Sequence, residues 1–281
     1  MRAVVKTIAT AAVAVTAIIS SASAADLRVK APPPVVEVWT WDKFYVGLNG
    51  GYSWGRSDTA GTFYNNTTGV QLAPTQFSTL NLDGAVLGGQ IGKNWQNGKW
   101  VFGLEADGQW TDERGGTGFN CPTPINGGPC NLLTFGPGFG VSPTSTFNQE
   151  ISWFATFRGR AGVLLTPTAL LYATGGLAVA GIKTDGVIAG FTPAGAPTAI
   201  AWANDETRFG WVVGAGLEAR LTGNWTGKIE GLYMDYGSVS GAPVLLTSNP
   251  PLRFNYSSNI TDIVVRAGIN YHFGNTIVAK Y

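Results

Sequence analysis

The sequence carries little charge and few of the residues that build metal or redox sites. Only 12% of its 281 residues are charged, and it contains one histidine and two cysteines. One histidine without a thiolate cluster excludes a zinc site with the usual ligands. The formal net charge is +1, and no lysine or arginine cluster could follow a phosphate backbone. We therefore expect no metal, no cofactor and no nucleic-acid partner.

Long apolar runs are also missing from residue 25 onward. Every apolar stretch there is interrupted by glycine, asparagine or a charged residue before it reaches the length of about 18 residues that a membrane-spanning helix needs. Yet 44% of the residues are hydrophobic and 39 are glycine. With so few charges, the chain could hardly cover a water-soluble surface of the usual kind. Some apolar surface must face something other than water.

The first 24 residues have the three parts of a secretory signal peptide. A short basic start precedes an uncharged apolar run over residues 8–19, and the small residues Ala22-Ser23-Ala24 follow it. We predict cleavage after Ala24. The alternative is an uncleaved anchor, which the short apolar run and the missing charged flank disfavour. The predicted division of the chain is a signal peptide over residues 1–24, a proline-rich periplasmic linker over 25–42, and one domain over 43–281.

Alternation of apolar with small or polar residues predicts strands throughout that domain. In the clearest segment, Phe209, Trp211 and Val213 point one way, while the intervening residues are mostly glycine or charged. The faces of the fifth segment cannot be assigned. The predicted strands cover residues 44–56, 83–95, 100–110, 150–165, 170–182, 208–221, 225–236 and 261–273.

The connections between these segments decide the architecture. Tight turns of about 3 to 4 residues alternate with links of about 23 to 39 residues that are rich in glycine, proline and small polar residues. This asymmetry is typical of an outer-membrane barrel, with short turns in the periplasm and long loops outside the cell. We therefore predict an all-β fold: an eight-stranded antiparallel transmembrane β-barrel in a bacterial outer membrane, integral, with both termini periplasmic.

Aromatic residues support this placement because they gather near the predicted strand ends. Two girdles at the membrane surfaces are the simplest explanation. The alternative is a soluble β-sandwich or lipocalin, which would expose charged faces, whereas the apolar faces here are almost free of charge. The turn-side group is Trp95, Trp100, Trp225, Tyr271 and Phe273, and the loop-side group is Tyr52, Trp54, Trp110, Trp153 and Tyr236.

The opposite faces of the strands would bring charges of both signs into the lumen. Because an eight-stranded barrel is only wide enough for its own side chains, we expect these charges to pair as a plug. The alternative is a narrow pore lined by the excess arginine. The predicted lumen cluster comprises Glu105, Asp107, Arg158, Arg160, Arg208, Glu218, Arg220, Lys228, Glu230 and Arg266.

Two further features concern chemistry outside this cluster. Cys121 and Cys130 both fall in the longest predicted outer loop, where an oxidising envelope and an even count favour a disulfide. The single histidine, His272, lies at the turn-side end of the last predicted strand. Hydrolysis would ordinarily need a serine or cysteine beside such a base, and the strand pattern places none there. We therefore predict no catalytic residues, and keep a lipid-acting enzyme as a distant alternative.

Five short segments also carry a family resemblance, and they occur in this order: 44–52, Gly103-Leu104-Glu105-Ala106-Asp107, Arg158-Gly159-Arg160-Ala161-Gly162, 172–178 and Asn270-Tyr271-His272-Phe273-Gly274. The sequence resembles the porin-family outer-membrane immunogenic proteins, which are relatives of the OmpA-like barrels, over the whole predicted mature chain. The resemblance implies an eight-stranded barrel in a Gram-negative cell envelope, exposed as a surface antigen and without enzymatic activity. It also implies that barrel-assembly machinery reads the terminal aromatic residues.

The sequence thus predicts a structural role. We expect a surface-exposed barrel that contributes to envelope integrity and presents its outer loops. The rival functions are a small-solute porin and, third, a lipid-acting enzyme. The expected partners are outer-membrane lipid, with lipopolysaccharide as a further candidate, and the assembly machinery during biogenesis. The sequence indicates no oligomeric state, and the long second and third loops depart from the family pattern.

Overall fold

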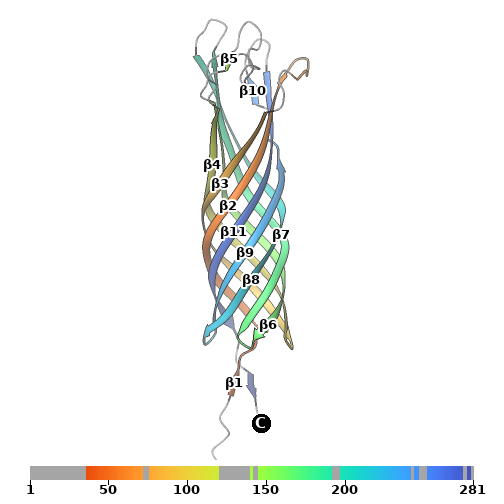
Figure 1. The fold of residues 1–281 in the computed structure, drawn as a ribbon, viewed down its shortest axis with the longest axis vertical. Coiled ribbons are helices and arrows are strands. Elements are labelled where there is room, and N and C mark those ends of the chain that lie inside the picture. Colours follow the sequence, from red (N-terminus) through yellow and green to blue (C-terminus); the bar gives the residue numbers. More distant parts are fainter. Residues whose placement is uncertain are drawn as a thin grey trace, which may run out of the picture.

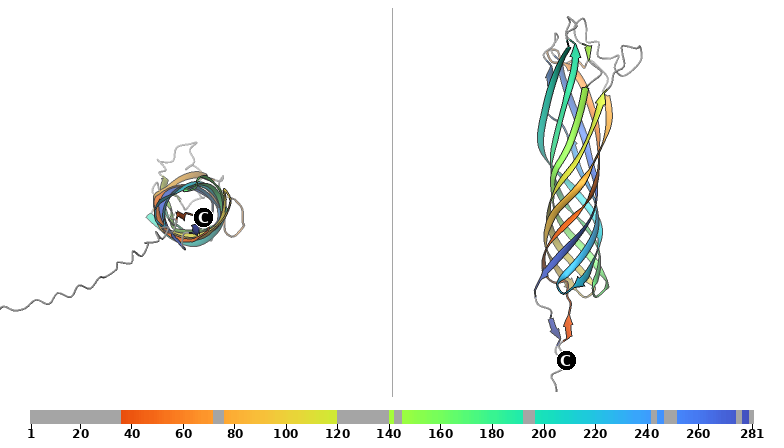
Figure 2. Two further views of the ribbon diagram at one scale, coloured as in Figure 1. Left: turned by 90° about the horizontal axis from the view of Figure 1, so that it is seen from below. Right: turned by 90° about the vertical axis from the view of Figure 1, so that its left-hand side faces the viewer.

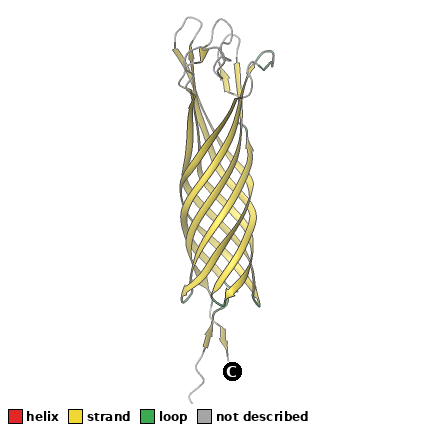
Figure 3. Ribbon diagram, in the orientation of Figure 1, coloured by secondary structure: helices red, strands yellow, loops and turns green. Residues whose placement is uncertain are grey.

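The computed structural model describes most of the predicted domain as β-structure (Figure 3). Within the described residues, no helix is long and apolar enough to cross a membrane. The predicted signal peptide, its cleavage site after Ala24, and both cysteines lie outside the described residues. These are residues 36–71, 76–119, 140–141, 145–191, 197–241, 244–246, 252–274 and 277–279.

Long strands make up the wall of the fold, and four short strands lie at its ends. The long strands are β2 (Phe44–Asn65), β3 (Gln76–Asn97), β4 (Trp100–Phe119), β6 (Ser145–Thr166), β7 (Ala169–Phe191), β8 (Pro197–Thr222), β9 (Trp225–Val239) and β11 (Leu252–Phe273). The short ones are β1 (Val36–Val38), β5 (Gly140–Val141), β10 (Val244–Leu246) and β12 (Ile277–Ala279).

The long strands close into a barrel. Each pairs antiparallel with the next, in the order β2, β3, β4, β6, β7, β8, β9 and β11, and β11 pairs back with β2. Seen along its axis, the sheet is a ring (Figure 2). β1 and β12 pair with each other in a separate two-stranded sheet beyond one end of the barrel (Figure 1). The prediction of an antiparallel barrel is confirmed.

Two-residue turns join the strands at the end nearest β1 and β12, which we call the turn end. Asn97 pairs with Trp100, so Gly98 and Lys99 form the turn between β3 and β4. Gly98 has a φ of 59°, and Gly223 at the equivalent place between β8 and β9 has a φ of 52°. Tight hairpins need a positive φ at their first central residue, which glycine adopts without strain. The opposite end is the loop end.

Each predicted segment lies inside one of the long strands, but the strands are much longer than predicted. β7 runs on to Phe191 and β8 starts at Pro197, so most of the predicted link between them is strand. In the added parts the outward residues are mostly polar, small or charged, so the apolar outer face of the predicted segments does not continue. Alternation of apolar and polar residues therefore marks only the part of a strand that has an apolar outer face. It underestimates the length of strands that continue beyond that part.

An apolar belt surrounds the turn-end half of the barrel. Its only charged outward residue is Lys93, at the turn-end edge, which pairs with Asp42. From Phe44 to Trp54, ten residue steps cover about 33 Å along the strand, or about 25 Å at the usual tilt of about 40°, which matches an apolar membrane layer. The belt consists of the outward residues in 44–54, 85–95, 100–110, 153–165, 171–181, 209–221, 225–233 and 263–273.

Beyond the belt, towards the loop end, the outer wall becomes charged. β2 has 22 residues, so about half of its length lies past the belt. Outward charges begin immediately there, and several are cross-strand neighbours of opposite sign, such as Glu150 and Lys183. This half of the wall is therefore suited to a polar environment. The outward charged residues are Arg56, Asp58, Asp83, Asp112, Arg114, Glu150, Lys183, Asp185, Asp205, Asp235 and Arg253.

Two residues face the other way from the prediction. Tyr236 was expected in the loop-side girdle, but it has the same parity as Lys228 on β9 and is buried in the lumen; Tyr233 is the outward aromatic residue there. In the predicted strand 150–165, strict alternation predicts Ile151 on the apolar outer face together with Trp153. An irregularity between Ile151 and Trp153 shifts the register of β6, so Ile151 also points inward.

Candidate functional site

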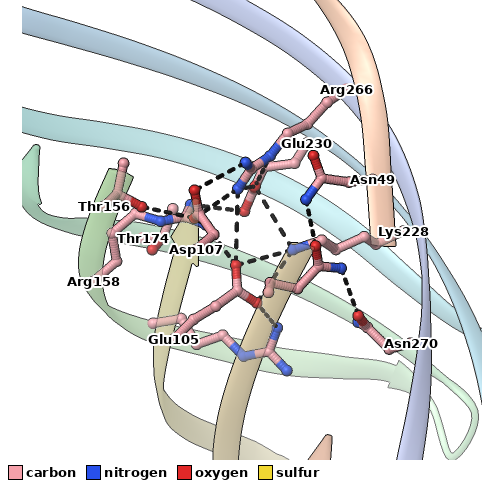
Figure 4. Close-up of polar contacts among 12 residues, drawn as sticks. Asn49, Glu105, Asp107, Thr156, Arg158, Thr174, Lys228, Glu230, Arg266 and Asn270 are labelled. Atoms are coloured by element: carbon pink, nitrogen blue, oxygen red, sulfur yellow. Dashed lines mark hydrogen bonds and ion pairs between the residues drawn. The ribbon is translucent and has the colours of Figure 1, made fainter. Parts of the chain in front are cut away.

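The centre of the lumen holds a network of buried charges. Its members are at alternate positions of β4, β6, β8, β9 and β11, where the two-residue period of a strand turns every second side chain inward. Figure 4 shows most of them converging from different sides of the barrel. We call this set the central network: Glu105, Asp107, Arg158, Arg160, Glu218, Lys228, Glu230 and Arg266.

Arg158 and Arg266 hold three carboxylates together. Arg158 is fully buried and donates hydrogen bonds to Asp107 Oδ2 at 2.8 Å, to Glu230 Oε1 at 3.0 Å and to Glu105. Arg266 donates from Nη2 to Glu230 Oε2 at 2.7 Å and to Asp107 Oδ2 at 3.0 Å. Forked guanidinium groups can contact two carboxylates at once, so each arginine cross-links different strands.

Lys228 and two tyrosines complete the contacts of Glu105 and Glu230. Lys228 Nζ donates to Glu105 Oε1 at 2.9 Å, and the Tyr45 hydroxyl donates to Glu105 Oε2 at 2.6 Å. Tyr172 donates to Glu230 Oε1 at 3.0 Å. The network therefore has four cationic and four carboxylate side chains, all of them buried, and is neutral as a set. Buried charges are tolerated only when they are paired and hydrogen-bonded in this way.

Glu218 extends the network towards the turn end. It accepts hydrogen bonds from Arg160 at 3.0 Å, Thr226 at 2.6 Å and Asn270 at 2.8 Å. His272 Nε2 lies 3.3 Å from Glu218 Oε1 and 3.1 Å from Thr226 Oγ1, and the ring is fully buried. In the described contacts its neighbours are thus an acid and a hydroxyl that already serve the network.

Tryptophan residues close the turn end of the lumen. Trp39 and Trp41 are buried, and their rings lie 5.3 and 5.8 Å from the His272 ring. The Trp41 backbone N–H donates to Gln96 Oε1 at 2.8 Å, and its indole N–H donates to the Pro167 carbonyl at 3.2 Å. The last residues of the predicted linker therefore form a cap at the turn end of the barrel. Their rings pack against other aromatic rings there, and the Trp41 indole N–H has a hydrogen-bond acceptor.

On the loop side of the network, the lumen contains a layer of apolar side chains. This second layer has no counterpart in the prediction, which placed polar side chains along the whole inner wall. Its sequence signal is a local loss of alternation, as in Trp211-Val212-Val213 and Ile263-Val264-Val265, where both faces of a strand are apolar. The layer includes Val86, Ile151, Phe154, Ala178, Val212, Leu232, Met234, Tyr236 and Val264.

A third layer lies nearer the loop end. The rings of Phe147, Trp202 and Tyr256 pack against one another with centroids 5.0 to 5.7 Å apart. Together with the cap and the two layers below, they fill the interior with buried side chains from the turn end to this aromatic layer. An eight-stranded barrel filled in this way encloses a packed core.

Two residues of the predicted lumen cluster lie apart from the rest. Arg208 pairs with Glu206 nearer the loop end, five inward positions from Glu218 on β8. Arg220 is near the turn, where its Nε donates to the Gly223 carbonyl at 2.9 Å and its guanidinium stacks on Trp39. Whether a residue occupies an odd or even position in a strand fixes which way its side chain points. It does not fix where the side chain lies along the barrel axis, and the prediction did not take this into account. Removing both from the set takes away the predicted arginine excess.

Metal chemistry finds no support in these layers. Across the described ranges, no group of three or more histidine, cysteine, aspartate or glutamate side chains is arranged to hold a metal ion. The disulfide predicted between Cys121 and Cys130 falls in the segment between β4 and β5, outside the described residues, and stays a prediction.

Comparison with known proteins points to one family. A family model described as an outer membrane protein β-barrel domain matches residues 10–273. The 31 kDa outer-membrane immunogenic protein of Brucella melitensis is 31% identical over 260 residues, which cover 90% of this chain and 94% of that protein. The 22 kDa outer membrane protein of Rhizobium leguminosarum is 28% identical over 207 residues, covering 73% of this chain and 69% of that protein.

Solved structures of low identity were also found. The outer membrane protease OmpT of Escherichia coli has 12% identity and a TM-score of 0.48, with 83% of this chain and 98% of that chain covered. OprG of Pseudomonas aeruginosa has 10% identity and a TM-score of 0.45, with 85% and 100% covered.

Proposed function

The chain belongs to the family of outer membrane β-barrel proteins, and we propose that it is a closed structural barrel that reinforces the outer membrane and presents its loop end outside the cell. The observation that carries the proposal is the filled lumen. The tryptophan cap, the central network, the apolar layer and the aromatic layer follow one another along the axis. A solute would have to displace all of them.

The charge balance of the lumen also supports a structural role. A selective pore needs charged side chains that are free to meet passing ions, as in the polar interiors of wider channels. Here the cations of the central network are bound to carboxylates, with Arg158 and Arg266 each contacting more than one. These bonds tie β4, β6, β9 and β11 together, so the network acts as a cross-brace inside the wall.

The proposed orientation puts the turn end, with β1 and β12, in the periplasm. The belt would contact lipid acyl chains, and the charged wall past the belt would stand among the head groups and sugars of the outer leaflet. Outward Arg114 and Lys183 lie where lipopolysaccharide phosphates would meet them. The surface-antigen role is supported by the name of the Brucella relative, an outer-membrane immunogenic protein.

The proposal includes no catalytic activity. Its support is local: His272 is buried beneath the tryptophan cap and contacts Glu218 and Thr226. A base in that position lacks both an exposed nucleophile and access for a substrate. The relatives are likewise named for their place in the outer membrane.

Epitope tags on intact cells test the orientation. A tag between β4 and β6 should be labelled by antibody without permeabilisation, whereas a tag at the turn between β8 and β9 should be labelled only after permeabilisation. The reverse pattern would contradict the proposed orientation.

Deletion of the gene tests the role in envelope integrity. The deletion should sensitise cells to detergent with a chelator, and the full chain should restore resistance. Unchanged sensitivity would count against a role in envelope integrity.

A further inference from the structure

Two buried carboxylates lie in the lumen outside the central network. Glu113 of β4 and Asp262 of β11 point inward on the loop side of Arg266, and their side chains are 0% and 1% exposed. Their strand neighbours in the sheet are apolar or glycine: Glu113 pairs with Ile151, and Asp262 pairs with Gly55 and Met234. We call Glu113 and Asp262 the carboxylate pair.

The backbone is shaped to accommodate Glu113. Glu113 has the same parity on β4 as Glu105 and Asp107, so its side chain points into the lumen. Gly55 and Gly84 leave the space that it fills, because a Cβ on Gly55 would lie 2.2 Å from Glu113 Oε1, and a Cβ on Gly84 would lie 2.5 Å from the Glu113 backbone nitrogen. Two glycines whose missing side chains make room for one buried acid indicate a built feature.

The carboxylate pair has no cation, in contrast to the central network. None of the described lysine, arginine or histidine side chains makes an ion pair with Glu113 or Asp262. Arg266 lies two inward positions from Asp262 on β11, and its guanidinium is already hydrogen-bonded to Asp107 and Glu230. The network is neutral without the pair, so the pair would add two uncompensated negative charges to the lumen.

Three carboxylate oxygens of the pair also lack a hydrogen-bond partner. Both Glu113 oxygens and Asp262 Oδ2 are buried and unpartnered, and Asp262 Oδ1 accepts a hydrogen bond from the Ser53 hydroxyl. The other ionisable groups that act on the pair are the Tyr236 hydroxyl from β9 and Asp83, which points outward on β3. The Tyr236 hydroxyl donates to Met234 Sδ at 3.3 Å.

We propose that Glu113 and Asp262 form a proton-binding site inside the barrel, in which the pair holds at least one proton in the folded protein at neutral pH. Two carboxylates cannot both stay ionised side by side in a dry, apolar site. A proton turns one unpartnered oxygen into a donor and gives the other an acceptor role. A divalent metal fits poorly, because Ca²⁺ takes six to eight oxygen ligands and the site offers few besides the pair.

Proton binding makes the loop half of the barrel sensitive to pH. The folded pair retains a proton that the same side chains release in the unfolded chain at neutral pH. By linkage, the folded state therefore loses stability as the pH rises. Loss of the proton would set two like charges against each other in the apolar layer, between the central network and the aromatic rings of the loop end.

Infrared spectroscopy of the refolded full chain tests the proposal directly. A protonated carboxyl group has a carbonyl band separate from that of a carboxylate. The wild-type protein should show this band at neutral pH and lose it on alkaline titration. The double variant Glu113→Gln/Asp262→Asn should lack the band, while Glu150→Gln, on the outer wall, should keep it. The alkaline loss of unfolding temperature should be smaller in the double variant than in the wild type.

Three results would overturn the proposal. The first is a wild-type protein without the protonated band at neutral pH. The second is a band that survives in a correctly folded double variant, which would assign it to another carboxyl group. The third is an unfolding temperature that rises with added calcium and falls with a chelator, with no protonated band, because the occupant would then be a metal ion. The wild-type titration needs no variant to fold.

Discussion

Replacing Arg158 by alanine should cost more stability than almost any other single change in the lumen. The side chain is fully buried and makes ion pairs with Glu105, Asp107 and Glu230. Its removal leaves three buried carboxylates short of one cation, and breaking a buried ion pair in this way costs about 3–5 kcal/mol. At about 1.4 kcal/mol per factor of ten, the unfolding equilibrium constant rises more than about a hundredfold.

The assay is urea unfolding of the barrel in phospholipid vesicles, followed by tryptophan fluorescence and by the heat-dependent shift in electrophoretic mobility. The matched control is Arg56→Ala, which breaks an ion pair with Asp58 on the exposed outer wall and should change the midpoint little. Adding Glu230→Gln to Arg158→Ala removes one uncompensated charge and should recover part of the loss. A urea midpoint for Arg158→Ala equal to that of the wild type would refute the claim that the central network stabilises the barrel by linking its strands.

Four further substitutions separate the inside of the wall from the outside in the same assay. Leu232→Ala empties part of the apolar layer and should cost about 2–5 kcal/mol, whereas Ile229→Ala on the belt should cost less; equal losses would contradict the assigned faces. Leu48→Arg places a charge at the middle of the belt and should cost about 2–4 kcal/mol, and full stability would mean that this face does not meet lipid. Trp41→Ala removes half of the cap and should cost about 3–5 kcal/mol, so a wild-type midpoint would show that the cap is dispensable.

The barrel could be predicted from the sequence because its outer face has only one simple requirement. Lipid contact demands an apolar residue at every second position, and segments such as Phe209 to Leu221 meet that demand without exception. The part of the wall towards the loop end was missed. Residues such as those of 197–207 lie beyond the belt, where lipid contact does not require alternating apolar residues. Strand pairing there depends on neighbours, which a single segment does not reveal.

The interior was harder to predict because several kinds of side chain can fill it. Eight of the ten predicted lumen charges meet in the central network, since ionised groups on the inward face must pair. The height of Arg208 and Arg220 depends on strand stagger, which parity does not give. Glu113 was missed for another reason: it has the inward parity of β4, but it lies beyond residue 110, where the predicted segment ended.

Single-channel recording in a planar bilayer tests the central claim, that the lumen is closed. Refolded protein whose barrel has been verified by electrophoresis before and after heating should give no conductance steps, because the central network and the layers on either side of it fill the interior. Reproducible steps whose ion selectivity changes when Arg158 or Arg160 is neutralised would contradict the account, and would make the chain a narrow porin.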